Sequence, residues 1–408
     1  MSMQSDAKNV LIIFKFIFYI IYRSIRSIIQ LESDIIALIR VVTKANITNE
    51  VEFFHILARN RLDNSDICRE CDFLLFSDHF GHFDELADQR WHIYSITDQY
   101  VYFCQIPSEE DLSILKNPKL SITFYEKAEK VARVNHITFA SYMNNNMLKA
   151  KTIFLHSTPA CGATLTAKML QSADSSARSF IVLGEPPMLS SLSILMYSLS
   201  IEKLRELTKN VIRFSLCHYN GNQTVLIKTR SCCGKLVPYV HHSYPSIQHI
   251  FVTSKNPSDG IPRLISKTST SIPIFRIICF FIRQAYPFCD FFTSWRRLER
   301  DTVVKIGPND SVEFTLAHIM GATVNYQRTL KYYALDIIYF EDLMIDTASV
   351  LRPILYLCGL SELVIPECIE WKRQEDFEDL NDKTSCLNNV QKQRIKVLVE
   401  LLQQEWNQ

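Results

Sequence analysis

Glycine is scarce in this chain, which has only 9 among its 408 residues. So low a content leaves no glycine-rich linker, and neither a low-complexity tract nor an internal repeat is visible. The phosphate-binding pattern G-x-x-x-x-G-K-[ST] is absent. Its absence argues against a kinase or NTPase that binds ATP or GTP on an ordinary P-loop.

An excess of charge is also lacking. Lys and Arg total 44 and Asp and Glu total 43, so the formal net charge is +1. The overall charge therefore does not indicate nucleic acid as a partner, and any anion-binding site must come from a local group of cations. Hydrophobic residues make up 47% and charged residues 21%, which is typical of a globular protein. The length fits one large α/β domain with an N-terminal piece, or two domains.

The sequence has no paired cysteine motif of the kind that binds zinc. Its 12 cysteines are scattered, and Cys68 and Cys71 form its one C-x-x-C. His79, His82 and His92 lie near acidic residues, but their spacing matches no common ligand pattern. We therefore expect no metal and mostly buried, reduced thiols.

No hydrophobic run is long enough for an obvious membrane span. Residues 10–22 are apolar apart from Lys15, but they fall short of the roughly 20 residues that a span needs. Arg23 and Arg26 follow the run, which favours a cytoplasmic or membrane-associated protein over a lumenal one. The apolar pattern continues at helical spacing through Ile21, Ile25, Ile28, Leu31, Ile35, Leu38 and Val42. We expect a helix over residues 10–42 whose apolar side is buried, faces a partner or contacts a membrane surface.

The next hundred residues carry no recognisable chemistry. Residues 73–76 and 100–106 are expected to be strands, residues 108–111 to start a helix, and residues 126–134 to form a charged helix. We expect residues 1–148 to form an N-terminal region of helical and mixed α/β structure and unknown role. Residues 149–408 are expected to form the main α/β domain.

The chain is organised around residues 151–171, KTIFLHSTPACGATLTAKMLQ. A short apolar strand, residues 152–155, leads into a tight turn and then a helix. Free backbone N–H groups and the helix dipole make such a turn an anion site. Gly162 allows the backbone to approach a ligand closely, and Thr164 can cap the helix and offer a hydroxyl.

Further apolar strands follow at intervals that leave room for helices. They are expected at residues 180–183, 225–227, 247–253 and 336–339. Strands that alternate with helices predict an α/β fold with a doubly wound, mostly parallel sheet flanked by helices. The segment 271–298 is expected to form helices that cover the sheet. Glu185 follows one strand and Lys228 and Arg230 follow another, where ligands bind in open α/β sheets.

Five segments in this order resemble the sulfotransferase family, whose members transfer a sulfuryl group from 3′-phosphoadenosine-5′-phosphosulfate. The segments are FLHSTPACGATL, LGEPPML, IKTRS, IFVTSKNPSDGIPRLIS and YFEDLMIDTASVLRPILYLCGLS. The resemblance covers about residues 150–365 and implies a P-loop-like α/β fold that uses this donor as co-substrate and no metal. It implies a hydroxylated acceptor, which is a carbohydrate, a protein or a small molecule.

The resemblance also implies which residues bind the donor. The 5′-phosphosulfate loop corresponds to Thr158, Cys161, Gly162, Ala163 and Thr164. In the 3′-phosphate motif, Lys255 stands at the family's arginine and Arg263 at its serine. Lys255 keeps the charge but loses the bidentate fork, and Arg263 either contacts the 3′-phosphate or blocks it.

Catalytic roles follow from the same resemblance. Glu185 corresponds to a glutamate that acts as general base in related enzymes. The family's loop cation corresponds to Ala160, so Lys228 or Arg230 would have to replace its charge. The loss at Ala160 leaves a second hypothesis open, a catalytically degenerate protein that binds nucleotide or acts as a scaffold.

Overall fold

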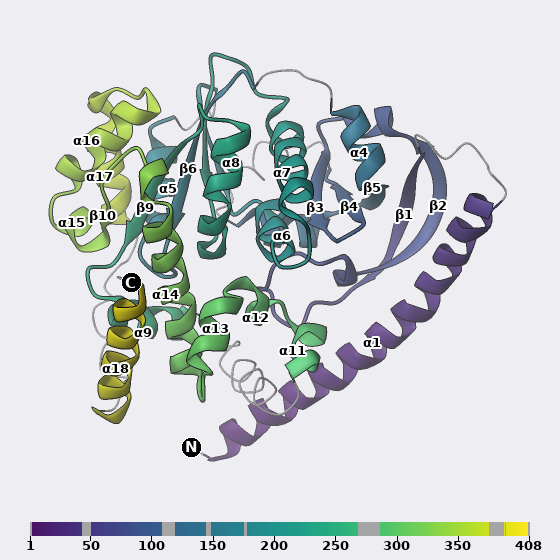
Figure 1. Cartoon of the computed structure of the whole chain (residues 1–408), viewed down its shortest axis with the longest axis horizontal. Helices are drawn as coiled ribbons and strands as arrows, with labels where there is room; N and C mark the ends of the chain where they lie inside the picture. The colour runs from purple at the N-terminus through teal and green to yellow at the C-terminus, as the bar shows by residue number, and fades with distance from the viewer. Residues whose placement is uncertain are drawn as a thin grey trace.

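The computed structural model describes residues 2–42, 50–107, 119–143, 148–174, 178–267, 286–374, 387 and 389–406. Two β-sheets lie beside each other, and a long N-terminal helix runs along one edge of the molecule (Figure 1). The helix start expected at residues 108–111 lies outside the described residues, as do residues 271–285 of the expected helical cover.

The second sheet is parallel and contains all five strands predicted for the main domain. Its strands are β6 (Lys151–Ser157), β7 (Phe180–Gly184), β8 (Thr224–Lys228), β9 (Gln248–Thr253) and β10 (Ile338–Tyr339). They lie in the order β10-β9-β6-β8-β7, and every pairing is parallel. The chain places β7 and β8 on one side of β6 and then β9 and β10 on the other. This reversal at β6 creates a crevice at the carboxyl ends of the strands.

Helices cover both faces of the parallel sheet, because its strands are apolar on both sides. Phe154 and Ile227 point into a core that includes α6 and α7, whereas Ile153 and Leu226 point into another that includes α5 and α16. The helices on and around the sheet are α5 (Ala163–Ser172), α6 (Pro187–Leu195), α7 (Ile201–Leu216), α8 (Val237–Ser243), α9 (Gly260–Lys267), α11 (Tyr286–Phe292), α12 (Trp295–Leu298), α13 (Arg300–Ile306), α14 (Ser311–Arg328), α15 (Phe340–Ile345), α16 (Thr347–Cys358), α17 (Ile365–Gln374) and α18 (Asn389–Trp406).

The first sheet is antiparallel, in the order β2-β1-β5-β4-β3. Its strands are β1 (Glu50–Arg59), β2 (Phe73–His82), β3 (Trp91–Ile96), β4 (Tyr100–Gln105) and β5 (Lys130–Asn135), and α3 (Leu120–Lys127) and α4 (His136–Tyr142) flank β5. The charged helix expected over residues 126–134 is therefore wrong, because most of it is the central strand β5. Arg133 on this strand is buried and ion-paired with Glu52 at 2.6 Å, so its charge does not mark an exposed surface.

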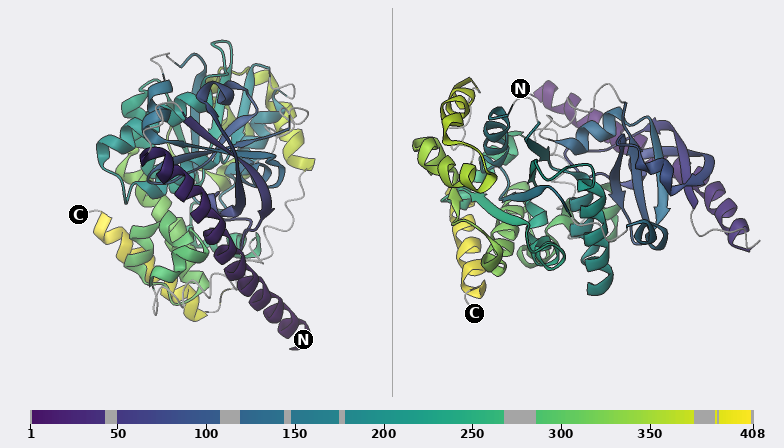
Figure 2. Two further views of the ribbon diagram at one scale, coloured as in Figure 1. Left: turned by 90° about the vertical axis from the view of Figure 1, so that its right-hand side faces the viewer. Right: turned by 90° about the horizontal axis from the view of Figure 1, so that it is seen from above.

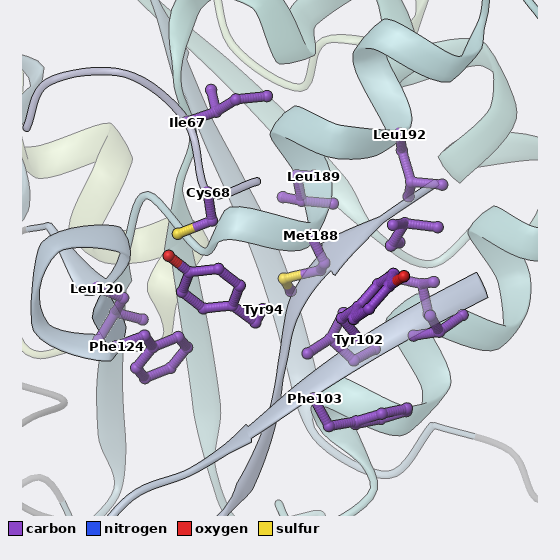
Figure 3. Close-up of a cluster of buried hydrophobic side chains, with 14 of the residues drawn as sticks. Ile67, Cys68, Tyr94, Tyr102, Phe103, Leu120, Phe124, Met188, Leu189 and Leu192 are labelled. Carbon is purple, nitrogen blue, oxygen red and sulfur yellow. The ribbon is translucent and has the colours of Figure 1, made fainter. Parts of the chain in front are cut away.

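The antiparallel sheet shares a hydrophobic core with the helices of the parallel sheet. Tyr94, Tyr102 and Phe103 of β3 and β4 lie in one cluster with Met188 and other residues of α6 (Figure 3). Leu120 and Phe124 of α3 belong to the same cluster. Helix α3 is thus anchored in this shared core, where Phe124 stacks on His92 of β3.

Helix α1 (Ser2–Val42) confirms the helix predicted over residues 10–42 and lies along the edge of the body (Figure 2). The predicted apolar stripe is not buried against the body, since Ile21 is 51% exposed and Ile28 is 71% exposed. The opposite side packs instead: Tyr19 is 2% exposed, and Arg26 donates to the backbone carbonyl of Glu70 at 3.1 Å. Contacts of the partly buried Arg23 and Arg26 with backbone oxygens, which the sequence does not reveal, help to hold this side against the body. No helix in the described part of the chain is both long and apolar enough to cross a bilayer.

Candidate functional site

The loop of residues 158–162 joins β6 to α5 at the centre of the parallel sheet. The backbone of Ala160 has φ 58° and that of Gly162 has φ 82°, both in the left-handed region. Gly162 is the N-cap of α5, which begins at Ala163, so Thr164 lies inside the first turn and does not cap the helix as expected. The first backbone N–H groups of α5 have no partner within the helix and can bind an anion.

Contacts with the neighbouring strand hold the loop in place. The Thr158 and Thr253 hydroxyls lie 2.9 Å apart, and Cys161 Sγ donates to the Val252 carbonyl oxygen at 3.1 Å. The Cys161 side chain therefore faces the sheet, and burial raises the pKa of its thiol. Cys161 can offer a ligand its backbone N–H but not a thiolate.

Gly162 is required by contact as well as by conformation. A Cβ atom at this position would lie 2.1 Å from Cδ2 of Phe340, the first residue of α15. Phe340 thus covers the loop closely, and only glycine fits beneath its ring. Phe340 also lies 4.8 Å from the Arg263 guanidinium, which is stacked over the ring.

Glu185 and Lys228 form an ion pair at the carboxyl ends of β7 and β8. Glu185 has φ 49°, a conformation that non-glycine residues rarely adopt, and its backbone N–H donates to the Lys228 carbonyl oxygen at 2.7 Å. Such strain is common at functional sites. Burial alone would raise the pKa of Glu185, but the charges of Lys228 and Arg230 outweigh it and lower the pKa. The carboxylate is therefore ionised at neutral pH.

Arg230 is fixed by residues from the N-terminal third of the chain. Its Nη2 donates to the Ser65 carbonyl oxygen at 2.8 Å, and its guanidinium lies 5.2 Å from the centre of the Trp295 ring. Trp295 Nε1 in turn donates to Asp63 Oδ2 at 3.0 Å. Asp66 Oδ2 accepts from the Ser294 backbone N–H at 2.8 Å. The segment around residues 63–66 therefore clamps one wall of the site.

These groups surround one cavity of about 320 Å³. The predicted site residues that line it are Glu185, Lys228, Arg230, Thr158, Cys161, Gly162, Ala163, Thr164 and Arg263. Its cationic side chains are Lys119, Lys168, Lys228, Arg230 and Arg263, and Glu185 is its single acidic side chain among the described residues. A chain of almost zero net charge thus concentrates positive charge here, as an anionic ligand requires.

Lys255 is the one predicted site residue that does not line the cavity. Its ammonium group is 2.6 Å from Asp342 Oδ1, and its side chain is 52% exposed. Its backbone N–H donates to Glu341 Oε2 at 2.9 Å. Of the two cations that the resemblance relates to a 3′-phosphate, Arg263 lines the cavity and Lys255 lies outside it.

Sequence reasoning missed several residues that line the cavity. Lys168 could have been found, because it lies one helical turn after Thr164 and so on the same face of α5. Asn64, Ser65 and Lys119 come from the N-terminal third, and no local pattern connects them with a loop that follows residue 157. No group of three or more His, Cys, Asp or Glu side chains could hold a metal ion within the described ranges.

No family model and no curated protein matches this sequence. Among solved structures, a sulfotransferase from Alicyclobacillus acidocaldarius is 13% identical, with a TM-score of 0.34 over 64% of this chain and 100% of that chain. A sulfotransferase from Mycobacterium avium is 10% identical, with a TM-score of 0.33 over 59% of this chain and 73% of that one. A sulfotransferase domain from the curacin biosynthetic pathway is 12% identical, with a TM-score of 0.29 over 53% and 76%.

Proposed function

We propose that this protein transfers a sulfuryl group from 3′-phosphoadenosine-5′-phosphosulfate to a hydroxyl group of an acceptor. The observation that carries the proposal is the cavity itself. A phosphate loop, several cations and one ionised carboxylate converge at the switch point of a parallel sheet. The order of five sequence motifs, which resembles that of sulfotransferases, supports a sulfuryl group as the group to be transferred.

The donor's anionic groups have matching positions in this cavity. The 5′-phosphosulfate lies against the backbone N–H groups from Cys161 to Thr164, at the N-terminus of α5. The 3′-phosphate lies at Arg263, which lines the cavity, whereas Lys255 lies outside it and is ion-paired with Asp342. The volume of about 320 Å³ is at the lower end of the range of roughly 300–1,000 Å³ typical of small-molecule sites.

The reaction is an in-line displacement at sulfur. The acceptor oxygen forms a bond to sulfur, and the bond from sulfur to the bridging phosphate oxygen breaks. The nucleotide bisphosphate leaves with the bonding electron pair, and the hydroxyl proton passes to Glu185. Such a loose transition state depends mainly on positioning and on charge stabilisation.

The ion pair with Lys228 defines how Glu185 acts. Because its pKa is lowered, the carboxylate is ionised and ready to accept a hydrogen bond from the acceptor hydroxyl. It is a weaker base than a carboxylate tuned to neutral pH. We therefore infer that the proton moves late, after the new bond from the acceptor oxygen to sulfur has made the hydroxyl proton acidic.

One observation favours the second candidate, a protein that binds the nucleotide without transferring sulfate. Ala160 places a methyl group where the resemblance implies a cation. Calorimetric titration with 3′-phosphoadenosine-5′-phosphate tests the nucleotide site shared by both candidates. Release of labelled sulfate from the donor, with water or an added alcohol as acceptor, then separates them. If the protein fails to bind the bisphosphate, both candidates are excluded.

A further inference from the structure

The outer side of α1 carries a long apolar surface, the outer stripe. It consists of ten large apolar side chains between Phe14 and Ile39 that are 44–71% exposed. The helix lies along the outside of the body (Figure 2). A large apolar side chain has roughly 150–200 Å² of surface, so the outer stripe offers on the order of 1,000 Å². The largest apolar patch on a typical monomer is about 300–600 Å², so a surface of this size indicates an interaction site.

The spacing of the outer stripe is that of a helix that packs on another helix. Its central residues are Phe14, Phe18, Ile21, Ile25, Ile28 and Ile35. They are separated by alternating steps of four and three, with Glu32 at the one remaining position of the series. Helices of coiled coils repeat in this way because a repeat of 3.5 residues keeps one seam facing the partner helix.

The charges near the outer stripe argue against an anionic lipid surface as its partner. Arg23 and Arg26 are turned toward the body, where each donates to a backbone carbonyl oxygen at 3.1 Å. Within residues 14–35, whose side chains the structure describes, Lys15 is the only fully exposed basic side chain. Helices that lie on anionic membranes are rich in Lys and Arg beside the apolar face. An almost uncharged stripe is instead suited to another apolar helix.

We propose that the outer stripe pairs with the same stripe of a second copy of this chain. Specific, stable interfaces bury about 800 Å² on each partner, and the outer stripe of α1 supplies this area alone. The body packs on the opposite side of the helix through Tyr19 and Arg26, so two copies can meet without a body between their helices. A two-fold pair covers both stripes and closes at the dimer.

Glu32 determines the direction of the two helices. In a parallel pair, the two exposed Glu32 side chains would face each other within the seam, where like charges repel. In an antiparallel pair that overlaps over the whole of α1 (Ser2–Val42), each Glu32 faces the N-terminal half of the other helix. The two carboxylates are then about 30 Å apart, at 1.5 Å per residue. The proposed pair is therefore antiparallel.

Sedimentation equilibrium of the full chain measures the dissociation constant of this dimer. We expect Ile28→Gln to weaken dimerisation by about 10²- to 10⁴-fold, because the two-fold axis removes two buried isoleucines from each dimer. Ile137→Gln is the matched control, since Ile137 is 84% exposed on α4, away from α1 (Figure 1). It should leave the dissociation constant unchanged. Below that constant, urea unfolding of Ile28→Gln should match wild type, which shows that the variant is folded.

Three results would overturn the proposal. The first is a wild-type chain that sediments as a monomer at roughly 0.1 mM. The second is a dimer that Ile28→Gln weakens no more than Ile137→Gln does. The third is a monomer that floats with vesicles of phosphatidylcholine and phosphatidylserine unless it carries Ile28→Gln, which would assign the outer stripe to lipid. A disulfide between two copies of Glu32→Cys would show a parallel pair and contradict the antiparallel arrangement.

Discussion

Replacing Gly162 with alanine tests whether the loop between β6 and α5 depends on the absence of a side chain at this position. The new Cβ atom would lie 2.1 Å from Cδ2 and 2.4 Å from Cε2 of Phe340. The ring is 6% exposed and has little room to move. The backbone at Gly162 also has φ 82°, which costs an ordinary residue roughly 1–2 kcal/mol.

Gly359 provides a matched control, because it has φ 73° at the end of α16 and nothing lies within 4 Å of its Cβ position. Gly359→Ala therefore introduces the backbone strain alone. About 0.4–1 kcal/mol of that cost is offset, because alanine makes the unfolded chain less flexible than glycine does. Gly162→Ala has the same strain and must also displace Phe340. Complete loss of a buried aromatic side chain costs about 3–5 kcal/mol. We expect Gly162→Ala to be about 2–5 kcal/mol less stable than Gly359→Ala.

Urea unfolding of both variants measures this difference in stability. Titration with 3′-phosphoadenosine-5′-phosphate measures whether the loop still binds the nucleotide. Gly162→Ala should lose nucleotide binding, whereas Gly359→Ala should retain it. In a Phe340→Leu background the extra cost of Gly162→Ala should shrink, because the two positions are in contact. Equal free energies of unfolding for the two glycine variants would refute the reasoning.

Three other predictions address the site and the N-terminal helix. Glu185→Gln should abolish sulfate transfer but leave nucleotide affinity nearly intact. Because the pKa of Glu185 is lowered in the folded protein, its ion pair stabilises the protein above the unfolded pKa of about 4.3. The difference in free energy of unfolding between wild type and Glu185→Gln, measured in urea, should therefore shrink as the pH falls through the folded pKa. Arg263→Ala should weaken the binding of 3′-phosphoadenosine-5′-phosphate, measured by calorimetry, by about 10- to 150-fold, whereas Lys255→Ala should leave it nearly unchanged. The reverse result would place the 3′-phosphate at Lys255. Tyr19→Ala should lower the free energy of unfolding by about 3–5 kcal/mol and Ile21→Ala by no more than about 0.5 kcal/mol, and similar losses would contradict the observed orientation of α1.

The parallel sheet could be predicted because its strands are short apolar runs that stand out from the polar turns around them. Strand β5 could not, because its burial depends on a partner far along the chain. Arg133 lies 81 residues from Glu52, and only their pairing makes a charged residue compatible with a central strand. The orientation of α1 was hidden for a similar reason, since its apolar stripe is exposed while Arg26 faces the body.

The site was predictable where local sequence determines geometry and not where distant residues meet. The loop around Gly162 and the strand ends at Glu185 and Lys228 carry local signals, and the structure brings them together around the cavity. Lys255 has the right place after its strand, but Asp342 competes for it from 87 residues away. Lys119 has no motif at all, because its position follows from how the adjoining helix α3 packs into the shared hydrophobic core.

The clamp on Arg230 has a consequence for how the protein folds. Arg230 and Ser65 are 165 residues apart, and Trp295 and Asp63 are 232 residues apart. Contacts of such long sequence separation form slowly, because a large loop must close first. During synthesis the segment around Asp63 emerges long before Trp295 exists. The cavity is therefore completed only after most of the chain has been made, so a nascent chain that stops short of Trp295 cannot have a finished site.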